Sequence, residues 1–173
     1  MKTATIVTLL LVLGAAGAFV VGCGKSESPS DSGAQVAEPA GAPDPANARA
    51  IEITGNDTMK FSLTEIHAKA GETLTVTLMN VGTMPKLSMG HNWILLKNTA
   101  AVEPLIADAP QAATTDYIPA SHSGDILAHT KLLGPGEKDS VTFRVPSKRG
   151  RYPFICSFPG HYQVGMKGEL IVE

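Results

Sequence analysis

The most informative segment lies near the C-terminus and reads Cys-Ser-Phe-Pro-Gly-His-Tyr-Gln-Val-Gly-Met from Cys156 to Met166. It supplies a thiol, an imidazole from His161 and a thioether. A second stretch, Met-Gly-His-Asn-Trp over residues 89–93, adds the imidazole of His91. Two His and one Cys with a weak axial Met form a blue-copper electron-transfer site. The pattern therefore predicts that His91, Cys156, His161 and Met166 hold one type 1 copper ion.

The spacing of these residues has a physical basis. Pro159 and Gly160 are turn-forming residues, and a turn between Cys156 and His161 can bring both side chains to one metal. Thiolate and thioether are soft ligands that suit Cu(I), whereas imidazole suits both oxidation states. Because His91 is distant in the sequence, the folded domain must bring it to the other three.

Several stretches of the chain resemble the azurins, a family of small bacterial cupredoxins, over roughly residues 50–173. They are Gly-Asn-Asp at 55–57 with Met59 and Phe61, Met-Gly-His-Asn-Trp at 89–93, Ala-His-Thr-Lys-Leu at 128–132, Gly-Glu-Lys-Asp-Ser-Val-Thr-Phe at 136–143, Cys-Ser-Phe-Pro-Gly-His at 156–161 and Met-Lys-Gly at 166–168. The auracyanins, which are azurin-like photosynthetic bacterial copper proteins on a membrane anchor, are a close subgroup.

The resemblance implies an all-β fold, a cupredoxin-like Greek-key β-sandwich with a short helical flap. It also implies that the backbone carbonyl of Gly90 approaches the metal opposite Met166, since glycine has no side chain in the way. The residue after His91, Asn92, and the backbone amide of Phe158 would support the Cys156 sulfur. Such hydrogen bonds orient ligands and tune a metal.

The chain departs from the azurin pattern in three respects. Four residues separate His161 from Met166, as in plastocyanins, where azurins usually have three. This difference affects the expected axial distance and reduction potential. The usual azurin disulfide is excluded, because the only cysteines are Cys23 and Cys156. The third departure is an N-terminal extension.

The N-terminal extension begins as a lipoprotein-type signal peptide over residues 1–22. A nearly uncharged apolar run follows Lys2, and such a short early run fits a secretory signal. It ends in Val-Val-Gly-Cys, which looks like a bacterial lipoprotein processing box with lipidation at Cys23. The alternative is an uncleaved N-terminal membrane helix. Both interpretations tether the protein outside the cytoplasmic membrane.

Residues 23–48 form the lipidated Cys23 and a flexible linker in this interpretation. The linker is rich in Ser, Gly, Ala and Pro and lacks aromatic residues, so it cannot bury a core. Roughly 25 residues of random coil span about 25–30 Å. A tether of that reach would let the domain turn toward different partners.

Residues 49–173 form one cupredoxin domain with a single core. Alternating apolar and polar residues predict strands at 50–54, 73–78, 140–145 and 168–172, and an apolar run predicts a more buried strand at 91–96. The Ala-rich segment from 99 to about 123 contains three prolines and is interpreted as a flap with a short helix. Trp93 is expected in the core.

These features predict a membrane-tethered carrier of single electrons in the periplasm or on the extracytoplasmic face, and not an enzyme. Redox proteins would dock at the exposed edge of His161, and we expect a monomer. A net charge of −2 without a basic stripe argues against nucleic acid. A periplasmic copper carrier or metallochaperone remains an alternative. A copper enzyme would need a second, open copper site, which the other histidines do not suggest.

Overall fold

The computed structural model describes residues 43–173. The strands are β1 (Arg49–Gly55), β2 (Glu65–Ala68), β3 (Thr73–Asn80), β4 (Ile94–Leu96), β5 (Ile126–His129), β6 (Lys138–Arg144), β7 (Gly150–Ile155) and β8 (Lys167–Val172). The helices are α1 (Lys86–Met89) and α2 (Val102–Asp108), with 3₁₀ segments η1 (Pro45–Asn47), η2 (Thr99–Ala101), η3 (Ala109–Thr115) and η4 (Ala120–Asp125).

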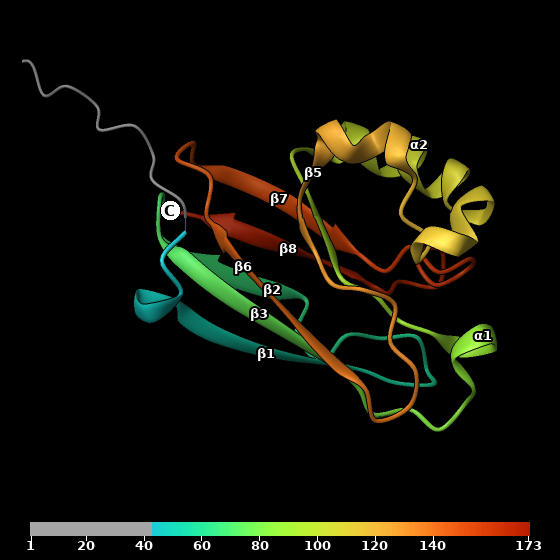
Figure 1. The fold of residues 1–173 in the computed structure, drawn as a ribbon. Coiled ribbons are helices and arrows are strands. Elements are labelled where there is room, and N and C mark those ends of the chain that lie inside the picture. The colour runs from blue at the N-terminus through green and yellow to red at the C-terminus, as the bar shows by residue number, and fades with distance from the viewer. Residues whose placement is uncertain (1–42) are drawn as a thin grey trace, which may run out of the picture. The chain divides into compact units, whose positions relative to one another are not determined.

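The strands form two sheets that pack face to face (Figure 1). One sheet has the order β1-β3-β6 and the other β2-β8-β7-β4-β5. β1 pairs with β3, and β2 with β8, in parallel, whereas the other pairs are antiparallel. Strands β1 to β4, and again β5 to β7, alternate between the two sheets, and the expected Greek-key β-sandwich with a helical flap is confirmed.

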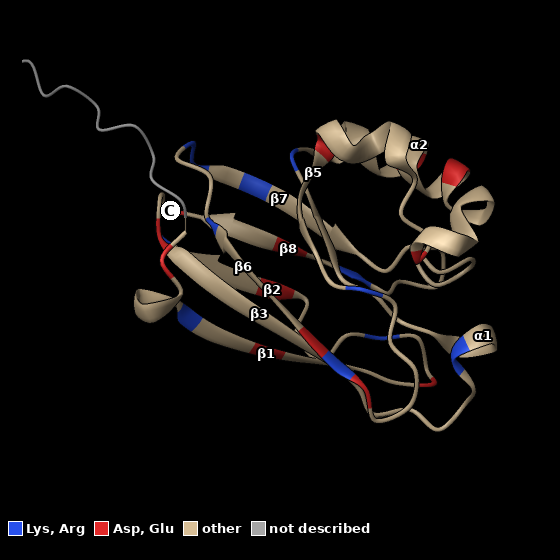
Figure 2. Ribbon diagram, in the orientation of Figure 1, with Lys and Arg blue, Asp and Glu red and all other residues tan. Residues whose placement is uncertain are grey.

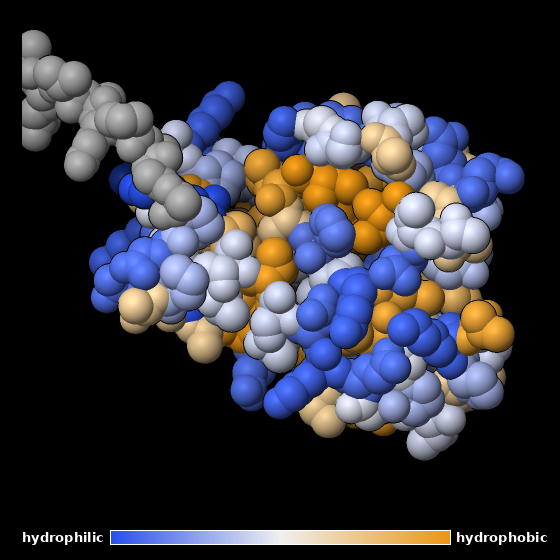
Figure 3. Space-filling model, viewed as in Figure 1, coloured by the Kyte–Doolittle hydropathy of each residue, from blue (hydrophilic) through white to orange (hydrophobic). Residues whose placement is uncertain are grey.

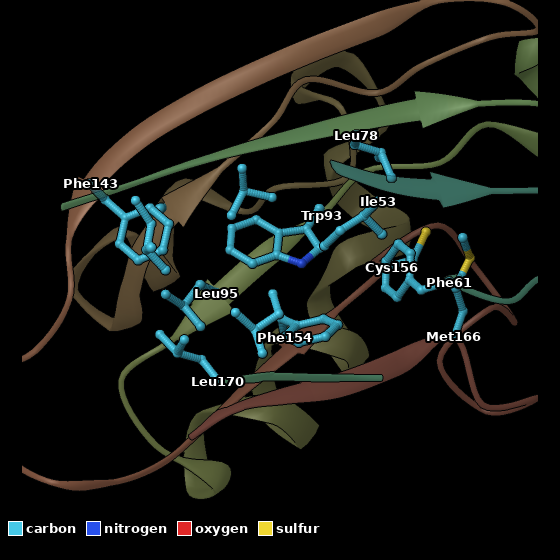
Figure 4. Packing of buried hydrophobic residues seen from close by; sticks show 14 of the residues in the cluster. Ile53, Phe61, Leu78, Trp93, Leu95, Phe143, Phe154, Cys156, Met166 and Leu170 are labelled. Atoms are coloured by element: carbon cyan, nitrogen blue, oxygen red, sulfur yellow. The ribbon is translucent and has the colours of Figure 1, made fainter. Parts of the chain in front are cut away.

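Alternation along the strands places one face of each sheet in the core between them. In β3 the buried residues Leu74, Val76 and Leu78 alternate with partly exposed threonines. Trp93 is fully buried and lies within 6.0 Å of the rings of Phe143 and Phe154, as expected for a core residue (Figure 4). This core supports the metal-binding end, where the same figure shows the sulfur atoms of Cys156 and Met166.

The flap is confirmed as a group of short helices over one end of the larger sheet (Figure 1). Asn98 accepts a hydrogen bond from the Ala101 amide at its start. Val102 and Leu105 of α2 bury their side chains against Ile94 and Ile155, forming a second apolar cluster. The flap therefore closes the outer face of β4 and β7 beside the metal-binding loop.

The strand predicted at residues 91–96 is shorter in the structure, where β4 covers only Ile94–Leu96. His91 instead makes an isolated bridge to Leu133, and the Trp93 amide donates to the Thr130 hydroxyl at 3.0 Å. A side-chain oxygen thus replaces a regular strand partner. The sequence patterns also missed β2, β5 and β7, because two are only four residues long and β7 contains Pro153.

The described chain begins within the segment predicted as a linker. There η1 is exposed and is capped by Asp44, whose carboxylate accepts from the Ala46 amide at 2.9 Å. No helix between residues 43 and 173 is long and apolar enough to span a membrane. Basic and acidic residues are interspersed over the face shown in Figure 2.

Candidate metal centre

The four predicted ligand residues come from two connections at one end of the sandwich, the α1–β4 segment and the β7–β8 loop. His91 follows α1, Cys156 follows β7, and Met166 immediately precedes β8. His161 lies in the turn between the last two. In Figure 1 this loop and α1 lie at the end of the domain opposite the C-terminus. All four residues are buried, with 0–2% of their surface exposed.

Three of the four donor groups face one another. Nδ1 of His91 lies 3.2 Å from Nδ1 of His161, and Sγ of Cys156 lies 3.5 Å from the same nitrogen. All three donor atoms lie within 4.8 Å of each other. Bonds of about 2.0 Å to nitrogen and 2.3 Å to sulfur, as for zinc, would place one ion between atoms so spaced. The sulfur of Met166 lies at the same end of the core as that of Cys156 (Figure 4).

Backbone hydrogen bonds fold the Cys156–Met166 loop on itself. The His161 amide donates to the Phe158 carbonyl at 3.1 Å, a turn that Gly160 permits with a φ of 86°. The Met166 amide donates to the His161 carbonyl at 2.9 Å, and the Cys156 amide donates to the Met166 carbonyl at 3.1 Å. Local hydrogen bonds therefore bring these three residues together, as the turn residues predicted.

Asn92 connects the two loops that carry His91 and Cys156. Its Oδ1 accepts from the Ser157 amide at 2.9 Å, and its Nδ2 donates to the Ser157 hydroxyl and to the Asp116 carbonyl, both at 2.8 Å. The Ser157 hydroxyl donates in turn to the Tyr117 carbonyl at 2.7 Å. The sequence pointed to Asn92 but gave no sign of Ser157 or the flap residues, because their contacts cross long sequence distances.

Burial changes the acidity of the donor groups. It raises the pKa of the Cys156 thiol to about 12, although the backbone amides of Asn92 and Phe158 act in the opposite direction. Burial and, to a lesser degree, the nearby His91 together lower the pKa of His161 to about 4. The pKa of His91 is also lowered by burial. Both imidazoles are therefore neutral at pH 7 and can offer nitrogen lone pairs.

The Nε2 atom of His91 is buried without a well-formed hydrogen bond, as is Nε1 of Trp93. The Asn56 backbone nevertheless lies close enough to His91 to oppose the lowering of its pKa, and Asp57 acts in the same direction.

Two glycines next to the site lie where a Cβ would collide with neighbouring atoms. A Cβ added to Gly55 would lie 2.8 Å from the Met166 methyl and 3.1 Å from the His91 ring. Gly90 ends α1, and a Cβ there would lie 2.7 Å from the Lys86 carbonyl oxygen. Sequence reasoning singled out Gly90 but missed Gly55, since β1 has no sequence signal that it ends behind the ligands.

Aromatic rings cover His161 from the flap side. The Phe158 ring lies 4.6 Å from the His161 ring, and Tyr117 packs edge-on against Phe158 at 4.9 Å. Only 2% of His161 is exposed, so the exposed edge expected from the sequence is limited to a very small part of this residue. The flap and the loop itself cover the ring more fully than the sequence indicated.

The remaining histidines lie away from this group. His67 and His129 are exposed, on β2 and β5 respectively. His122 lies in the flap, with Nε2 2.9 Å from the Asp108 carboxylate. Within residues 43–173, His91, Cys156 and His161 form the one group of His, Cys or carboxylate side chains placed to hold a metal. Cys23 lies outside the described residues.

The donor set fits copper by its chemistry. Two neutral imidazoles and a thiol converge in a buried space beside a thioether. A thiolate and two imidazoles form the trigonal set that copper electron-transfer sites use, whereas Mg²⁺ and Ca²⁺ prefer oxygen ligands. No carboxylate belongs to this group.

Comparison with known proteins agrees with this geometry. Residues 48–173 match the family model for copper-binding proteins of the plastocyanin/azurin family. The chain is similar to the azurin of Pseudomonas denitrificans, with 41% identity over 126 residues that cover 71% of this chain and 97% of the azurin. It is also 42% identical over 127 residues to the azurin of Pseudomonas aeruginosa PAO1. The aligned region covers 71% of this chain and 84% of that azurin.

The fold is also similar to the crystal structure of dithionite-reduced auracyanin from the photosynthetic bacterium Roseiflexus castenholzii. The TM-score is 0.65 and the sequence identity 33%, with 73% of this chain and 98% of the auracyanin covered. The family shows that the cofactor is copper, and the buried cluster is arranged as one type 1 site. The chain therefore belongs to the plastocyanin/azurin family of copper-binding proteins and is a blue-copper electron-transfer protein.

Proposed function

We propose that this chain is a membrane-tethered carrier that passes single electrons between redox proteins outside the cytoplasmic membrane. His91, Cys156, His161 and Met166 are the proposed ligands of its one copper ion. The observation that carries the proposal is the buried triangle of Cys156 Sγ and the two histidine Nδ1 atoms, with separations of 3.2 and 3.5 Å on two of its sides. Bound copper would supply one-electron chemistry by alternating between Cu(II) and Cu(I).

The chain's own contribution is to hold the donors in a fixed, dry arrangement. The hydrogen bonds from Asn92 to Ser157 join the two ligand loops, and the sandwich core lies directly behind them. Because interiors are close-packed, the donors have little freedom to move when the charge of the site changes. A ligand set that suits both oxidation states then needs little rearrangement.

Metal binding requires a proton to leave Cys156. With the thiol pKa raised to about 12 by burial, the copper-free protein carries a protonated thiol at pH 7. The metal must displace this proton, because the thiolate is the form that binds. The amides of Asn92 and Phe158, which favour the charged form, support the sulfur as proposed ligand.

Met166 and the Gly90 carbonyl are the proposed axial groups. Met166 is fully buried, and its methyl group packs against Gly55 close to the His91 ring. Gly90 directly precedes His91 and leaves no side chain between its backbone and the site. A thioether is a weak axial ligand, so we assign Met166 a tuning role.

Partner docking is proposed at the end that carries His161. The apolar side chains of Met84, Leu87 and Val164 are 41%, 90% and 48% exposed in the segments that flank the site. Figure 3 shows a hydrophobic protrusion at the end that carries α1. Since little of His161 is exposed, a partner would approach it through these neighbours. Transient redox contacts are small, which allows rapid release.

The tether is proposed from the sequence alone. Lipidation of Cys23 after removal of residues 1–22 would anchor the protein, and residues 23–48 would give the domain reach. This proposal places the protein in the periplasm or on the extracytoplasmic face.

Visible absorption with redox titration tests the proposed function. We expect the copper-loaded protein to show an intense thiolate-to-copper band that bleaches with reductant and returns with oxidant. Cys156→Ser should lose the band and remain folded, because a hydroxyl is not a soft ligand and the core is not built on the metal. A metallochaperone would instead bind Cu(I) and release it to acceptors without a reversible blue band. Persistence of the band in Cys156→Ser would refute the ligand assignment.

A further inference from the structure

An ammonium group from the β1–β2 connection contacts the metal-binding loop. Nζ of Lys60 donates a hydrogen bond to the backbone carbonyl of Val164, a residue 104 positions away. The neighbouring Gly165 has a φ of 96°, and a Cβ placed there would lie 2.8 Å from the same Nζ. The missing side chain at position 165 therefore leaves the space that the ammonium group occupies.

The contacted segment otherwise depends on its own hydrogen bonds. The amides of Val164, Gly165 and Met166 donate to carbonyls of residues 160, 162 and 161, all within the loop. In the part of the chain that the structure describes, no other side chain hydrogen-bonds to the backbone of residues 162–166. Among the described residues, Lys60 is thus the side chain whose hydrogen bond ties the backbone of this segment to the rest of the domain.

The support beneath Lys60 is firmly placed. The next residue, Phe61, is 6% exposed and bridges to Gly55, which packs behind both His91 and Met166. Ser62 exchanges hydrogen bonds with Thr54, as its amide donates at 2.9 Å and its hydroxyl accepts at 2.9 Å. Figure 4 shows Phe61, Cys156 and Met166 at the same end of the core.

We propose that Lys60 is a positioning residue for the copper loop, which holds the segment before Met166 closed and keeps a positive charge beside it. Only the expected effect of the Lys60 charge on the reduction potential rests on the proposed copper site. A fixed cation near the metal favours the less positive Cu(I) state and so raises the reduction potential. A hydrogen bond from a charged donor also restricts opening of the segment.

Lys97 offers a matched control. Its Nζ makes the same kind of contact, a hydrogen bond to the Gly124 carbonyl, but in the flap. Lys60→Met and Lys97→Met each remove one ammonium–carbonyl contact and one charge from an exposed position. Lys60→Arg keeps the charge and a donor. Because both lysines are exposed, we expect all three variants to fold.

Amide hydrogen exchange of the copper-free protein, followed by NMR, tests the positioning role. We expect exchange of the Gly165 and Met166 amides to become roughly fivefold faster in Lys60→Met, the effect of losing about 1 kcal/mol. Lys97→Met should leave these amides unchanged, and Lys60→Arg should restore most of the protection. Unchanged exchange in Lys60→Met would overturn the proposal, whether or not the protein binds copper.

Voltammetry of the copper-loaded variants tests whether the positive charge of Lys60 affects the reduction potential. The potential should shift to lower values in Lys60→Met but not in Lys97→Met, and the shift should shrink as salt is added. An equal shift in both variants would remove the specific role of Lys60. Failure of the wild type to take up copper would instead refute the proposed function and leave the exchange result standing.

Discussion

Asn92 and Ser157 join through two hydrogen bonds, one from the Ser157 amide to Asn92 Oδ1 at 2.9 Å and one from Asn92 Nδ2 to the Ser157 hydroxyl at 2.8 Å. Each residue directly follows a proposed ligand, His91 or Cys156. The pair therefore fixes the distance between the two loops that build the site, in a region where Asn92 is fully buried.

Asn92→Ala should destabilise the copper-free protein and change the reduction potential of the loaded one. The substitution leaves the buried Ser157 amide and the Asp116 carbonyl without their partner, which costs about 2–4 kcal/mol in total. Asn98→Ala, which removes a helix cap in the flap, should cost only about 1 kcal/mol and leave the potential unchanged. Urea denaturation and voltammetry compare the two, and equal potentials for Asn92→Ala and wild type would count against the linking role.

Gly55→Ala should disturb the site from behind. The added Cβ would lie 2.8 Å from the Met166 methyl and 3.1 Å from the His91 ring, so one of them must move. We expect a stability loss of about 1–3 kcal/mol from overpacking and an altered visible spectrum. Gly124→Ala adds a methyl group where nothing lies within 4 Å, and it should leave the spectrum unchanged. An unaltered spectrum in Gly55→Ala would show that the surroundings absorb the methyl group without moving a ligand.

Met166→Leu should raise the reduction potential while copper stays bound. Leucine has a similar volume, so the buried position remains filled, but the sulfur donor is lost and Cu(II) is destabilised relative to Cu(I). The protein should remain blue, because Cys156 is unchanged. Met79→Leu, at an exposed position on β3, provides the control. In voltammetry an unchanged potential would remove Met166 from the ligand set, and loss of copper would show that it is a strong ligand.

Stability of the copper-free protein should fall in mild acid. The folded-state pKa of His161 is lowered by burial to about 4 from an ordinary value of 6.5, and that of His91 is lowered as well. Between these pH values the unfolded chain binds more protons than the folded one, so the free energy of unfolding decreases as pH drops from about 6.5 to 4. The loss from His161 is about 3 kcal/mol at most. Urea denaturation across this range should show a flatter profile for His161→Gln, and an identical profile would exclude His161 as a source.

Cys23→Ser should abolish lipidation. The protein should then be either released from the membrane or left with its signal peptide uncleaved. In the proposed scheme the lipid is attached to the thiol sulfur of Cys23, and serine has no thiol group. Cys156→Ser, which changes the only other cysteine, should be lipidated normally. Mass spectrometry of the mature protein gives the result, and an N-terminus other than Cys23 without acyl mass would rule out the lipoprotein interpretation.

Residue types and their spacing were enough to predict the fold class, the cofactor and a set of proposed ligands. Cys156, His161 and Met166 lie on one loop, so their spacing and the turn residues between them carry the signal locally. The alternation of apolar and polar residues in β1, β3 and β8 also predicted strands correctly, because each strand has one face in the core. The short strands β2 and β5 offered too few residues for a pattern.

The enclosure of the site, in contrast, became visible only in the folded domain. Gly55 packs behind Met166 and His91, Ser157 bonds to Asn92, and Lys60 contacts Val164. These contacts cross long sequence distances, so no spacing could reveal them. The near-complete burial of His161 likewise follows from Phe158 and the covering flap rather than from the loop sequence alone. Ligand chemistry is a property of residue type and local order, whereas burial and positioning arise when distant segments pack together.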